Sequence, residues 1–359
     1  MTADLRWPGP LFVVGPSRSG TTMMQTILNR HPAVALAPET HYFDDLRPRV
    51  GGGPLAAMRP EDRDRCLDYF RALASRPYGK GGDPARSPLS RAELLARAEA
   101  RGGTADAAFE VFCRMRGARD RAAEAAIWGE KTPRHVFRLA EIFATYPQAR
   151  ALAMIRDPRA AVVSYRDWQY RGGYGGLETK PGFQAALEAD YDRARLSYHI
   201  VLSTLMWRAT VNTAYDATAR FGPERVRLLR YEDFVANPEV ELAGLCAWIG
   251  LEADLAMLKV PLHNSSAAGF APGAGVSADP TGRWRDKLDP HETGIIQRVA
   301  GRTLARVGYA PVPAAGGTLT LLRAYAELPR VVLRATRANR GRVGSLRAYI
   351  WRRFRAAVK

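Results

Sequence analysis

The sequence is poor in cysteine and has no long apolar run. The three cysteines are too few and too scattered for a disulfide framework or a zinc site, so we expect them to be reduced and buried: Cys66, Cys113 and Cys246. The N-terminal stretch MTADLRWPGP lacks the basic and apolar regions of a signal peptide. No run reaches the roughly 18 apolar residues that a membrane-spanning helix needs. These absences disfavour a secreted disulfide-rich domain and an integral membrane protein, and they predict a cytoplasmic location.

Acidic residues are outnumbered by basic ones. The 359 residues include 53 Lys and Arg but only 36 Asp and Glu, which gives a net charge of +17. Such an excess indicates an anionic ligand, an anionic surface, or both. We expect no nucleic acid as partner, because no recognition module is visible, and no metal, because the sequence holds no cluster of metal-ligating residues. The length suits one large α/β domain with insertions, or one domain with an appendage.

A short apolar strand, Leu11–Val14, leads into a glycine-rich turn. The turn reads G-x-x-x-x-G-T-T at 15–22, which is the spacing of a phosphate-binding loop. In such a loop, backbone N–H groups bind an anion at the start of the following helix. Thr21 stands where nucleotide triphosphatases have lysine, and Arg18 places a cation inside the turn. We therefore predict a loop that holds a phosphate or sulfate group without the lysine and Mg²⁺ used in ATP hydrolysis.

Apolar runs that end in a turn and precede a helix recur along the chain. They predict a doubly wound, mainly parallel sheet, because the pattern begins near residues 11, 34, 150 and 226. Residues 128–133 predict a polar loop, with Pro133 opening a helix that runs to Tyr146. Residues 47–90 show little periodicity. We interpret 45–125 as an insertion that covers the site and shapes an acceptor pocket.

A second cation follows the strand predicted at 149–155. Arg156 stands at the end of this strand, and Pro158 opens the next helix. Ser164 lies eight residues after Arg156, just over two helical turns, so the two side chains can face one ligand. A guanidinium binds a phosphate in bidentate fashion, and a hydroxyl adds another donor. The pair is therefore a candidate for a second phosphate site.

Three stretches together resemble the sulfotransferases that use 3′-phosphoadenosine 5′-phosphosulfate (PAPS): GPSRSGTT at 15–22, IRDPRAAVVSY at 155–165 and RYEDF at 230–234. The resemblance covers about residues 10–45 and 127–310 and implies a P-loop-like fold, with a central parallel sheet between two helical layers. It implies that the 5′-phosphosulfate is bound by Arg18, Ser19, Gly20, Thr21 and Thr22. It implies that the 3′-phosphate is bound by Arg156 and Ser164. It also implies that Tyr231 lies near the nucleotide and that the donor is covered by Arg283 and Trp284.

The segment HPAVALAPETHYF resembles the branch of these enzymes with a glutamate base, which includes the tyrosylprotein sulfotransferases. The resemblance implies that Glu39 is the catalytic base and that Lys131, in GEKTP, touches the transferring sulfuryl group. His41 is an alternative base. Pro133 stands where cytosolic aryl sulfotransferases have a catalytic histidine, so a histidine base from that loop is disfavoured. For His135 we expect a packing role.

Two positions depart from the tyrosylprotein enzymes. Trp168 stands where they carry a further arginine, and their late catalytic serine has here only the candidates Ser265 and Ser266. The identity of the acceptor therefore stays open. We predict an enzyme that moves a sulfuryl group from PAPS to an acceptor hydroxyl without a metal. The alternatives are a P-loop phosphotransferase, which Thr21 disfavours, and a non-catalytic nucleotide-binding protein docked on membranes.

The C-terminal end concentrates the positive charge. Residues 321–359 hold eleven basic residues and one acidic residue. Apolar residues recur there every four positions, with Trp351 beside them: Leu346, Ile350, Phe354 and Val358. We interpret 311–359 as a basic amphipathic extension of a sulfotransferase domain at 1–310, suited to peripheral binding at an anionic membrane or to a partner protein. The alternative is a helix packed on the enzyme's own body.

Overall fold

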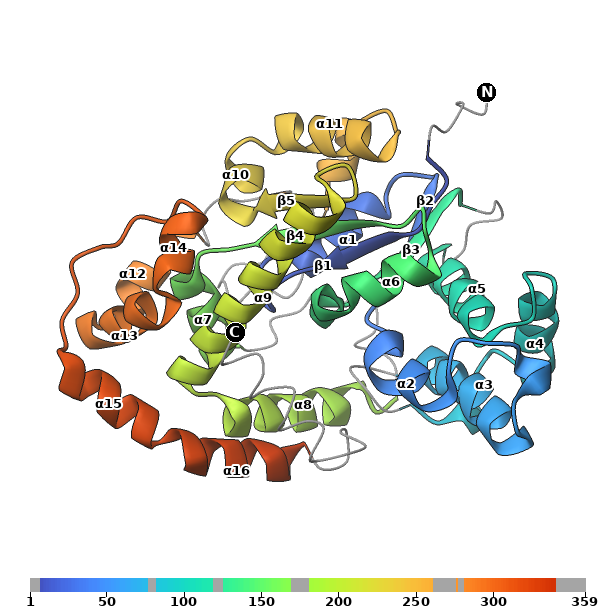
Figure 1. Ribbon diagram of the computed structural model, residues 1–359, viewed down its shortest axis with the longest axis horizontal. Helices are drawn as coiled ribbons and strands as arrows, with labels where there is room; N and C mark the ends of the chain where they lie inside the picture. Colours follow the sequence, from blue (N-terminus) through green and yellow to red (C-terminus); the bar gives the residue numbers. More distant parts are fainter. Residues whose placement is uncertain are drawn as a thin grey trace.

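The computed structural model describes residues 7–76, 82–118, 125–168, 181–260, 276 and 281–339. In these ranges five strands form one parallel sheet, in the order β2-β3-β1-β4-β5 (Figure 1). The strands are β1 (Leu11–Val14), β2 (Val34–Ala37), β3 (Ile127–Lys131), β4 (Arg150–Ile155) and β5 (Val226–Arg230). The prediction of a doubly wound parallel sheet is confirmed, because β1 pairs in parallel with β3 on one side and with β4 on the other.

β3 is a strand where the sequence predicts a loop. The expectation for residues 128–133 is wrong, because Ile127–Lys131 is a fully buried strand between β2 and β1. Its last two side chains, Glu130 and Lys131, are charged and make the segment look solvent-exposed. Lys131 instead pairs with Glu39 from another strand end, and Glu130 contacts Thr40, Thr132 and His135. A strand of this kind is recognised only after folding.

The chain around β3 is shaped by one glycine and one proline. Gly129 has φ +154°, and a Cβ atom there would lie 1.9 Å from the carbonyl oxygen of Leu11 on the neighbouring strand. A larger residue would therefore push β3 away from β1. Pro133 opens a 3-10 helix (Pro133–Arg138), which α6 (Leu139–Thr145) follows. The expected single helix to Tyr146 is thus two shorter pieces.

Successive residues of a strand point to opposite faces of the sheet, and helices cover both of these faces. Phe12 and Val14 pack in one hydrophobic cluster with α5 (Ala105–Ala118), α6 and α9 (Ile200–Phe221). Leu11 and Val13 pack in another cluster, on the opposite face, with α1 (Thr21–Leu28), α10 (Tyr231–Ala236) and α11 (Pro238–Ile249). The result is three layers, with the sheet in the middle.

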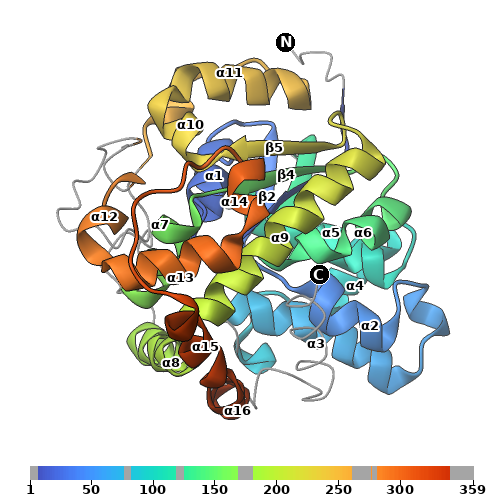
Figure 2. The same ribbon diagram turned by 60° about the vertical axis from the view of Figure 1, so that its left-hand side comes forward.

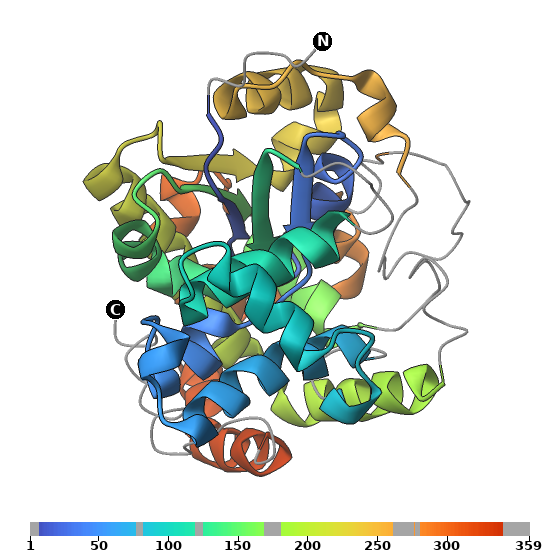
Figure 3. The ribbon, with the colours of Figure 1, turned by 90° about the vertical axis from the view of Figure 1, so that its right-hand side faces the viewer.

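The segment between β2 and β3 is largely helical and gathers on one side of the sheet (Figure 3). It begins with a π-helical turn (Tyr42–Leu46), followed by α2 (Arg47–Val50), α3 (Pro60–Ser75) and α4 (Arg91–Glu99) before α5. Two 3-10 turns, Leu55–Ala57 and Pro84–Arg86, lie before and after α3. Although residues 47–90 show little periodicity in the sequence, they contain the 16-residue helix α3. Its sequence, PEDRDRCLDYFRALAS, is dominated by charge, but it buries one apolar face that includes Phe70 and Leu73.

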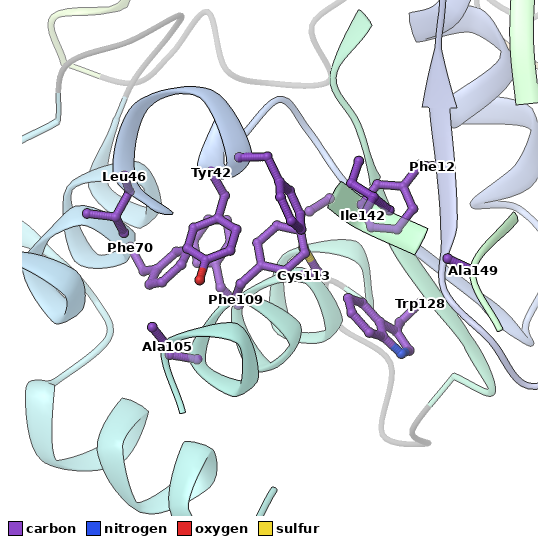
Figure 4. Packing of buried hydrophobic residues seen from close by; sticks show 14 of the residues in the cluster. Phe12, Tyr42, Leu46, Phe70, Ala105, Phe109, Cys113, Trp128, Ile142 and Ala149 are labelled. Atoms are coloured by element: carbon purple, nitrogen blue, oxygen red, sulfur yellow. The ribbon is translucent and has the colours of Figure 1, made fainter. Parts of the chain in front are cut away.

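An aromatic cluster anchors this segment to the sheet. The rings of Tyr42 and Phe109 stack with their centroids 4.7 Å apart, and Phe12 of β1 stacks on Phe109 at 6.4 Å (Figure 4). Such pairs contribute about 0.5–1.5 kcal/mol beyond their buried area. The Tyr42 hydroxyl donates a hydrogen bond to Asp106 on α5. The segment that follows β2 is therefore held in place by the core itself.

The C-terminal half adds α7 (Pro158–Arg166), α8 (Phe183–Ser197) and a 3-10 turn (Leu255–Leu258). The helices after these are α12 (Trp284–Lys287), α13 (Pro290–Ala300), α14 (Arg302–Arg306), α15 (Thr318–Ala326) and α16 (Leu328–Ala338). α16 lies along α8 (Figures 1 and 2). The Asn339 amide donates to the Ser197 hydroxyl at 3.1 Å, which ties the two helices together. The stripe from Leu346 to Val358 lies outside the described residues.

The cysteines are buried and unbridged, as expected. Burial raises the pKa of the Cys246 thiol to about 11, so this group stays protonated and poorly reactive at neutral pH. Of the helices in the described ranges, none has the length and apolar character needed to cross a membrane.

Candidate functional site

The loop between β1 and α1 has a backbone that few residues tolerate. Gly15 has φ +128°, and a Cβ atom there would lie 2.2 Å from the carbonyl oxygen of Met154. Arg18 has φ +70°, and Gly20, the N-cap of α1, has φ +83°. Left-handed residues in such a turn direct successive N–H groups to one side, an arrangement that can bind an anion at the positive end of a helix. Within the loop, Ser19 is fully buried.

Arg156 connects this loop to the end of β4. Its guanidinium donates a hydrogen bond to the carbonyl oxygen of Arg18 (3.2 Å) and lies 4.4 Å from the centroid of the Tyr231 ring. The Tyr231 ring is so close to Gly20 that a Cβ atom there would lie 2.6 Å from it. The structure thus brings together the three stretches that carry the family resemblance, although they are far apart in the chain.

Further cations and one aromatic residue join the cluster. Burial raises the pKa of Tyr231, while the charges of Arg156 and Arg283 act in the opposite direction, so Arg283 also lies near this ring. The Arg18 guanidinium lies over the Trp168 ring, 4.8 Å from its centroid. Sequence reasoning noted Trp168 only as a departure from the tyrosylprotein pattern and missed this support for Arg18. Ser164 is half-buried on α7, and the structure assigns no contact between it and Arg156.

The turn that carries Arg156 is held by residues that the sequence interpretation did not single out. The backbone N–H of Asp157 donates to Glu232 (3.0 Å), whose other oxygen accepts from the Tyr309 hydroxyl (2.7 Å). The buried Arg159 pairs with Asp157 at 2.6 Å and lies 4.2 Å from the Trp284 ring centroid. Trp284 is itself buried against α7. It therefore supports the Arg156 turn through Arg159.

At the other end of the site, Glu39 lies between the Lys131 ammonium group and the His41 imidazole. Lys131 Nζ donates to Glu39 Oε1 at 2.7 Å, and His41 Nε2 lies 3.2 Å from Glu39 Oε2. Burial alone would raise the pKa of Glu39, but the Lys131 charge, and the hydrogen bond and charge of His41, hold it well below its usual range. Glu39 is therefore ionised at neutral pH. The two predicted catalytic residues are in direct contact.

A buried network of hydrogen bonds around Glu130 supports the Glu39–Lys131 pair. Glu130, at the end of β3, accepts hydrogen bonds from the Thr40 backbone N–H (3.0 Å) and the Thr132 hydroxyl (2.9 Å). His135 Nδ1 lies 2.5 Å from Glu130, and the His135 ring packs edge-on against Phe43. Glu130 thus fixes the backbone beside Glu39, and the structure gives His135 a place in the support of the site.

The segment after β2 also reaches the base. The Tyr69 hydroxyl on α3 donates to the carbonyl oxygen of Thr40 at 2.5 Å. Arg76, which directly follows α3, is close enough for its charge to interact with Glu39. Sequence reasoning missed both residues, because nothing in their local pattern distinguishes them from ordinary surface positions.

The strand order arranges the whole site along one edge. At the carboxyl ends of β2, β3, β1, β4 and β5 stand, in that order, Glu39, Lys131, the 15–22 loop, Arg156 and Tyr231. Parallel strands lie about 4.8 Å apart, so the row spans roughly 19 Å. In open parallel sheets ligands bind at this edge. The Glu39–Lys131 pair, in which Glu39 can accept a proton, stands at one end of this row, and the cations around Arg156 stand toward the other. This arrangement suits a long anionic ligand that reacts at one of its ends.

Comparison with known proteins identifies the class. The family model described as "Sulfotransferase family" matches residues 10–254, which is more than half of the chain. The chain therefore belongs to the sulfotransferase family, and it is an enzyme that transfers a sulfuryl group. This finding decides against the two alternatives, a phosphotransferase and a non-catalytic nucleotide-binding protein.

Solved structures with a similar chain trace have sulfotransferase names. The sulfotransferase domain of the Synechococcus PCC 7002 olefin synthase is 17% identical, with a TM-score of 0.47, over 87% of this chain and 99% of that one. The sulfotransferase domain from the curacin biosynthetic pathway is 15% identical, with a TM-score of 0.49, over 86% and 100%. A sulfotransferase from Alicyclobacillus acidocaldarius is 18% identical, with a TM-score of 0.38, over 84% and 96%.

Proposed function

We propose that this enzyme transfers the sulfuryl group of PAPS to the hydroxyl of an acceptor and releases adenosine 3′,5′-bisphosphate. The observation that carries the proposal is the Glu39–Lys131 pair, 2.7 Å apart at the ends of adjacent strands. The strand of Lys131 is next to β1, whose loop is proposed to hold the anionic end of the donor. Glu39, which follows the next strand beyond Lys131, thus stands about two strand spacings, roughly 10 Å, from this loop.

The donor is proposed to lie along the sheet edge. Its 5′-phosphosulfate would be bound by the loop residues Arg18, Ser19, Gly20, Thr21 and Thr22. Its 3′-phosphate would be bound by Arg156 and Ser164, with the nucleotide beside Tyr231 and covered by Arg283 and Trp284. The contacts among Arg18, Arg156 and Tyr231 support this assignment, because they place several cations where a compound with two phosphate groups needs them.

Glu39 is proposed to accept the proton of the acceptor hydroxyl while the new S–O bond forms and the S–O bond to the donor phosphate breaks. Lys131 and Arg18 would stabilise the charge on the sulfuryl and leaving oxygens. As Lys131 turns from Glu39 to the sulfuryl group, the charge that lowers the pKa of Glu39 is withdrawn. Glu39 then becomes a stronger base when the donor is in place.

The C-terminal helices are proposed to bring the enzyme to an anionic membrane from the cytoplasmic side. α15 and α16 expose apolar side chains on the surface: Leu319, Leu322, Tyr325 and Leu333. Exposed basic residues stand among them: Arg323, Arg330, Arg334 and Arg337. Glu327, the only acid after residue 321, lies 3.3 Å from the buried His199, so one carboxylate stands among these four arginines. A mixed apolar and basic face of this kind suits the surface of an anionic bilayer.

The experiment is a transfer screen with radiolabelled PAPS against lipid, glycan, phenol and peptide hydroxyls. We expect labelled product with at least one class and about 10²–10⁴-fold slower labelling with Glu39→Gln. Glu252 is exposed and is not one of the proposed site residues, and Glu252→Gln is the matched control that should keep full activity. Calorimetry with adenosine 3′,5′-bisphosphate tests the donor independently. A protein that neither binds this nucleotide nor labels any acceptor would contradict the proposal.

A further inference from the structure

We propose that His41 is a positioning residue of the active site, which holds one oxygen of the Glu39 carboxylate while Lys131 holds the other. The inference rests on the proposed function for the role of Glu39 as base. It gives His41 a different role from that of the alternative base, because the imidazole would act through Glu39 and would not touch the acceptor.

The first observation is the backbone of His41. In the described part of the chain, Arg18 and His41 are the two residues other than glycine with positive φ, +70° and +56°. Residues held in this conformation cluster at functional sites, where the surrounding structure maintains the strain. The His41 carbonyl accepts hydrogen bonds from the N–H groups of Asp44 (3.0 Å) and Asp45 (2.8 Å), which begins the turn after β2. This turn brings the imidazole back to the carboxylate two residues earlier.

The second observation is the difference in exposure between the carboxylate and the groups that hold it. The side chains of Lys131 and His41 are only 7% and 10% exposed, whereas the Glu39 side chain is 39% exposed. Lys131 and His41 contact different carboxylate oxygens of Glu39, at 2.7 Å and 3.2 Å. The carboxylate is thus fixed from the protein side and remains open on the side from which an acceptor must approach.

The third observation concerns the charges around His41. Its ring faces Glu39 on one side, and its charge also acts on Asp44, a buried carboxyl near Arg134, His135 and Arg138. Glu39 in turn faces Lys131 and Arg76. During transfer the proposed contact of Lys131 with the sulfuryl group weakens its hold on Glu39. The His41 contact then remains to keep the carboxylate directed at the acceptor hydroxyl.

Two substitutions separate this role from a purely structural one. Asparagine tolerates a left-handed backbone well but is too short to reach Glu39, so His41→Asn keeps the turn and removes the contact. Glutamine is long enough to donate to Glu39 and does not titrate, so His41→Gln restores the contact. The titration of Glu39 is followed by NMR of the full chain labelled with [5-¹³C]glutamate, and its signal is assigned by its loss in Glu39→Gln. This measurement needs no acceptor.

We expect the titration midpoint of Glu39 to move to higher pH in His41→Asn, because a hydrogen bond that favours the charged form is lost. In His41→Gln the midpoint should lie between those of the wild type and His41→Asn, because the hydrogen bond is restored but the charge of the imidazole is not. Because Lys131→Gln removes a charge that lowers the pKa of Glu39, the two His41 variants are also measured in that background. The titration midpoint of Glu39 then lies in a pH range where the protein is folded. Proton affinity should change by roughly tenfold, as for the loss of one charge-assisted hydrogen bond. Binding of adenosine 3′,5′-bisphosphate, measured by calorimetry, should be unchanged in both variants.

An unchanged Glu39 titration in His41→Asn would overturn the inference. So would equal shifts in the asparagine and glutamine variants together with weaker nucleotide binding, since these would mean that His41 only maintains the fold. The base assignment itself is tested separately. If Glu39→Gln turns over like the wild type, Glu39 is not the base, and the positioning role proposed for His41 loses its basis. If Glu39→Gln is inactive and His41→Asn titrates normally, only the inference on His41 fails.

Discussion

Glu39 and Lys131 face each other at 2.7 Å across the carboxyl edge of the sheet, although 92 residues separate them in the chain. The pair exists because β2 and β3 are neighbours in the sheet, with Ala37 level with Glu130. Each residue therefore ends its strand beside the other. Strand pairing thus brings together the proposed base and the lysine that is proposed to contact the sulfuryl group.

Replacing the base should separate binding from turnover. In Glu39→Gln we expect adenosine 3′,5′-bisphosphate to bind as in the wild type, because the cation cluster stands at the other end of the sheet edge. Turnover should fall by about 10²–10⁴-fold, the usual contribution of general base catalysis. Calorimetry and the radiolabel assay measure the two quantities. A Glu39→Gln rate close to that of the wild type would move the role of base to another residue, such as His41.

Removing Arg156 should abolish recognition of the 3′-phosphate. The wild type should bind adenosine 3′,5′-bisphosphate much more tightly than AMP, and Arg156→Ala should lose most of this preference. A charge-assisted hydrogen bond contributes about 1.5–3 kcal/mol, so we expect at least a tenfold loss. The matched control is Arg302→Gln, at an exposed position on α14. Equal affinity of the wild type for the two nucleotides would contradict the assignment.

A single methyl group at Gly20 should disrupt the donor loop. Gly20→Ala places a Cβ atom 2.6 Å from the Tyr231 ring in a residue with φ +83°. The left-handed conformation and the overlap together should cost about 1–3 kcal/mol and weaken nucleotide binding accordingly. Gly53→Ala is the control, because a Cβ atom there meets nothing within 4 Å. Thermal unfolding and calorimetry compare the two variants, and identical results would argue against the close contact.

The buried carboxylate of Glu130 should make stability depend on acidity. Burial would raise its pKa, but the His135 charge and the hydrogen bonds from His135, Thr40 and Thr132 lower it below the ordinary value of 4.5. Below that pH the unfolded chain binds a proton that the folded chain does not, so the free energy of unfolding falls as the pH drops. Above it this stabilisation is complete.

Glu130→Gln should therefore flatten the acid side of the stability profile, measured by denaturant unfolding between about pH 3 and 7. At neutral pH the variant should be about 1–3 kcal/mol less stable, because buried hydrogen bonds to a charge are lost. Glu252→Gln, at an exposed position, should leave the profile unchanged. Parallel profiles for the wild type and Glu130→Gln would show that Glu130 does not titrate as described.

The proposed membrane face predicts salt-sensitive binding to anionic vesicles. Each arginine near such a surface contributes on the order of 1 kcal/mol, and salt screens it over about 8–10 Å. Replacing Arg323, Arg330 and Arg337 with glutamine should therefore strongly reduce cosedimentation with phosphatidylserine vesicles. The control removes the same charge from exposed positions elsewhere, Arg49, Arg86 and Arg302. If the full-length chain does not bind these vesicles at low salt, a protein partner becomes the better explanation for this basic face.

Deletion of 321–359 is expected to destabilise the enzyme as well as to remove vesicle binding. α16 buries Val331 and Ala335, and Arg334 donates to the Leu196 carbonyl oxygen at the end of α8. Loss of these contacts exposes the surface of α8. Thermal unfolding of the truncated chain measures the effect, and an unchanged midpoint would show that the tail adds nothing to the folded body.

Local patterns in the sequence were enough for the loop and for most strands. The spacing of Gly15 and Gly20, the apolar runs near 11, 34, 150 and 226, and Arg156 at a strand end are all short-range features. Each reflects a requirement of nearby backbone, such as a tight turn or a buried strand. The same patterns carried the family resemblance, and the match over residues 10–254 confirms it.

What only the tertiary structure decided depends on pairing between distant segments. β3 was not recognised because Glu130 and Lys131 look like loop residues until Thr40, His135 and Glu39 are placed around them. The roles inferred for His41 and for Trp168 beside Arg18 rest on contacts that no local pattern contains. A charge can be buried when a partner compensates for its lost hydration. The chain supplies those partners from other strands and helices, so the chemistry of this edge follows from the order β2-β3-β1-β4-β5 rather than from any one stretch of residues.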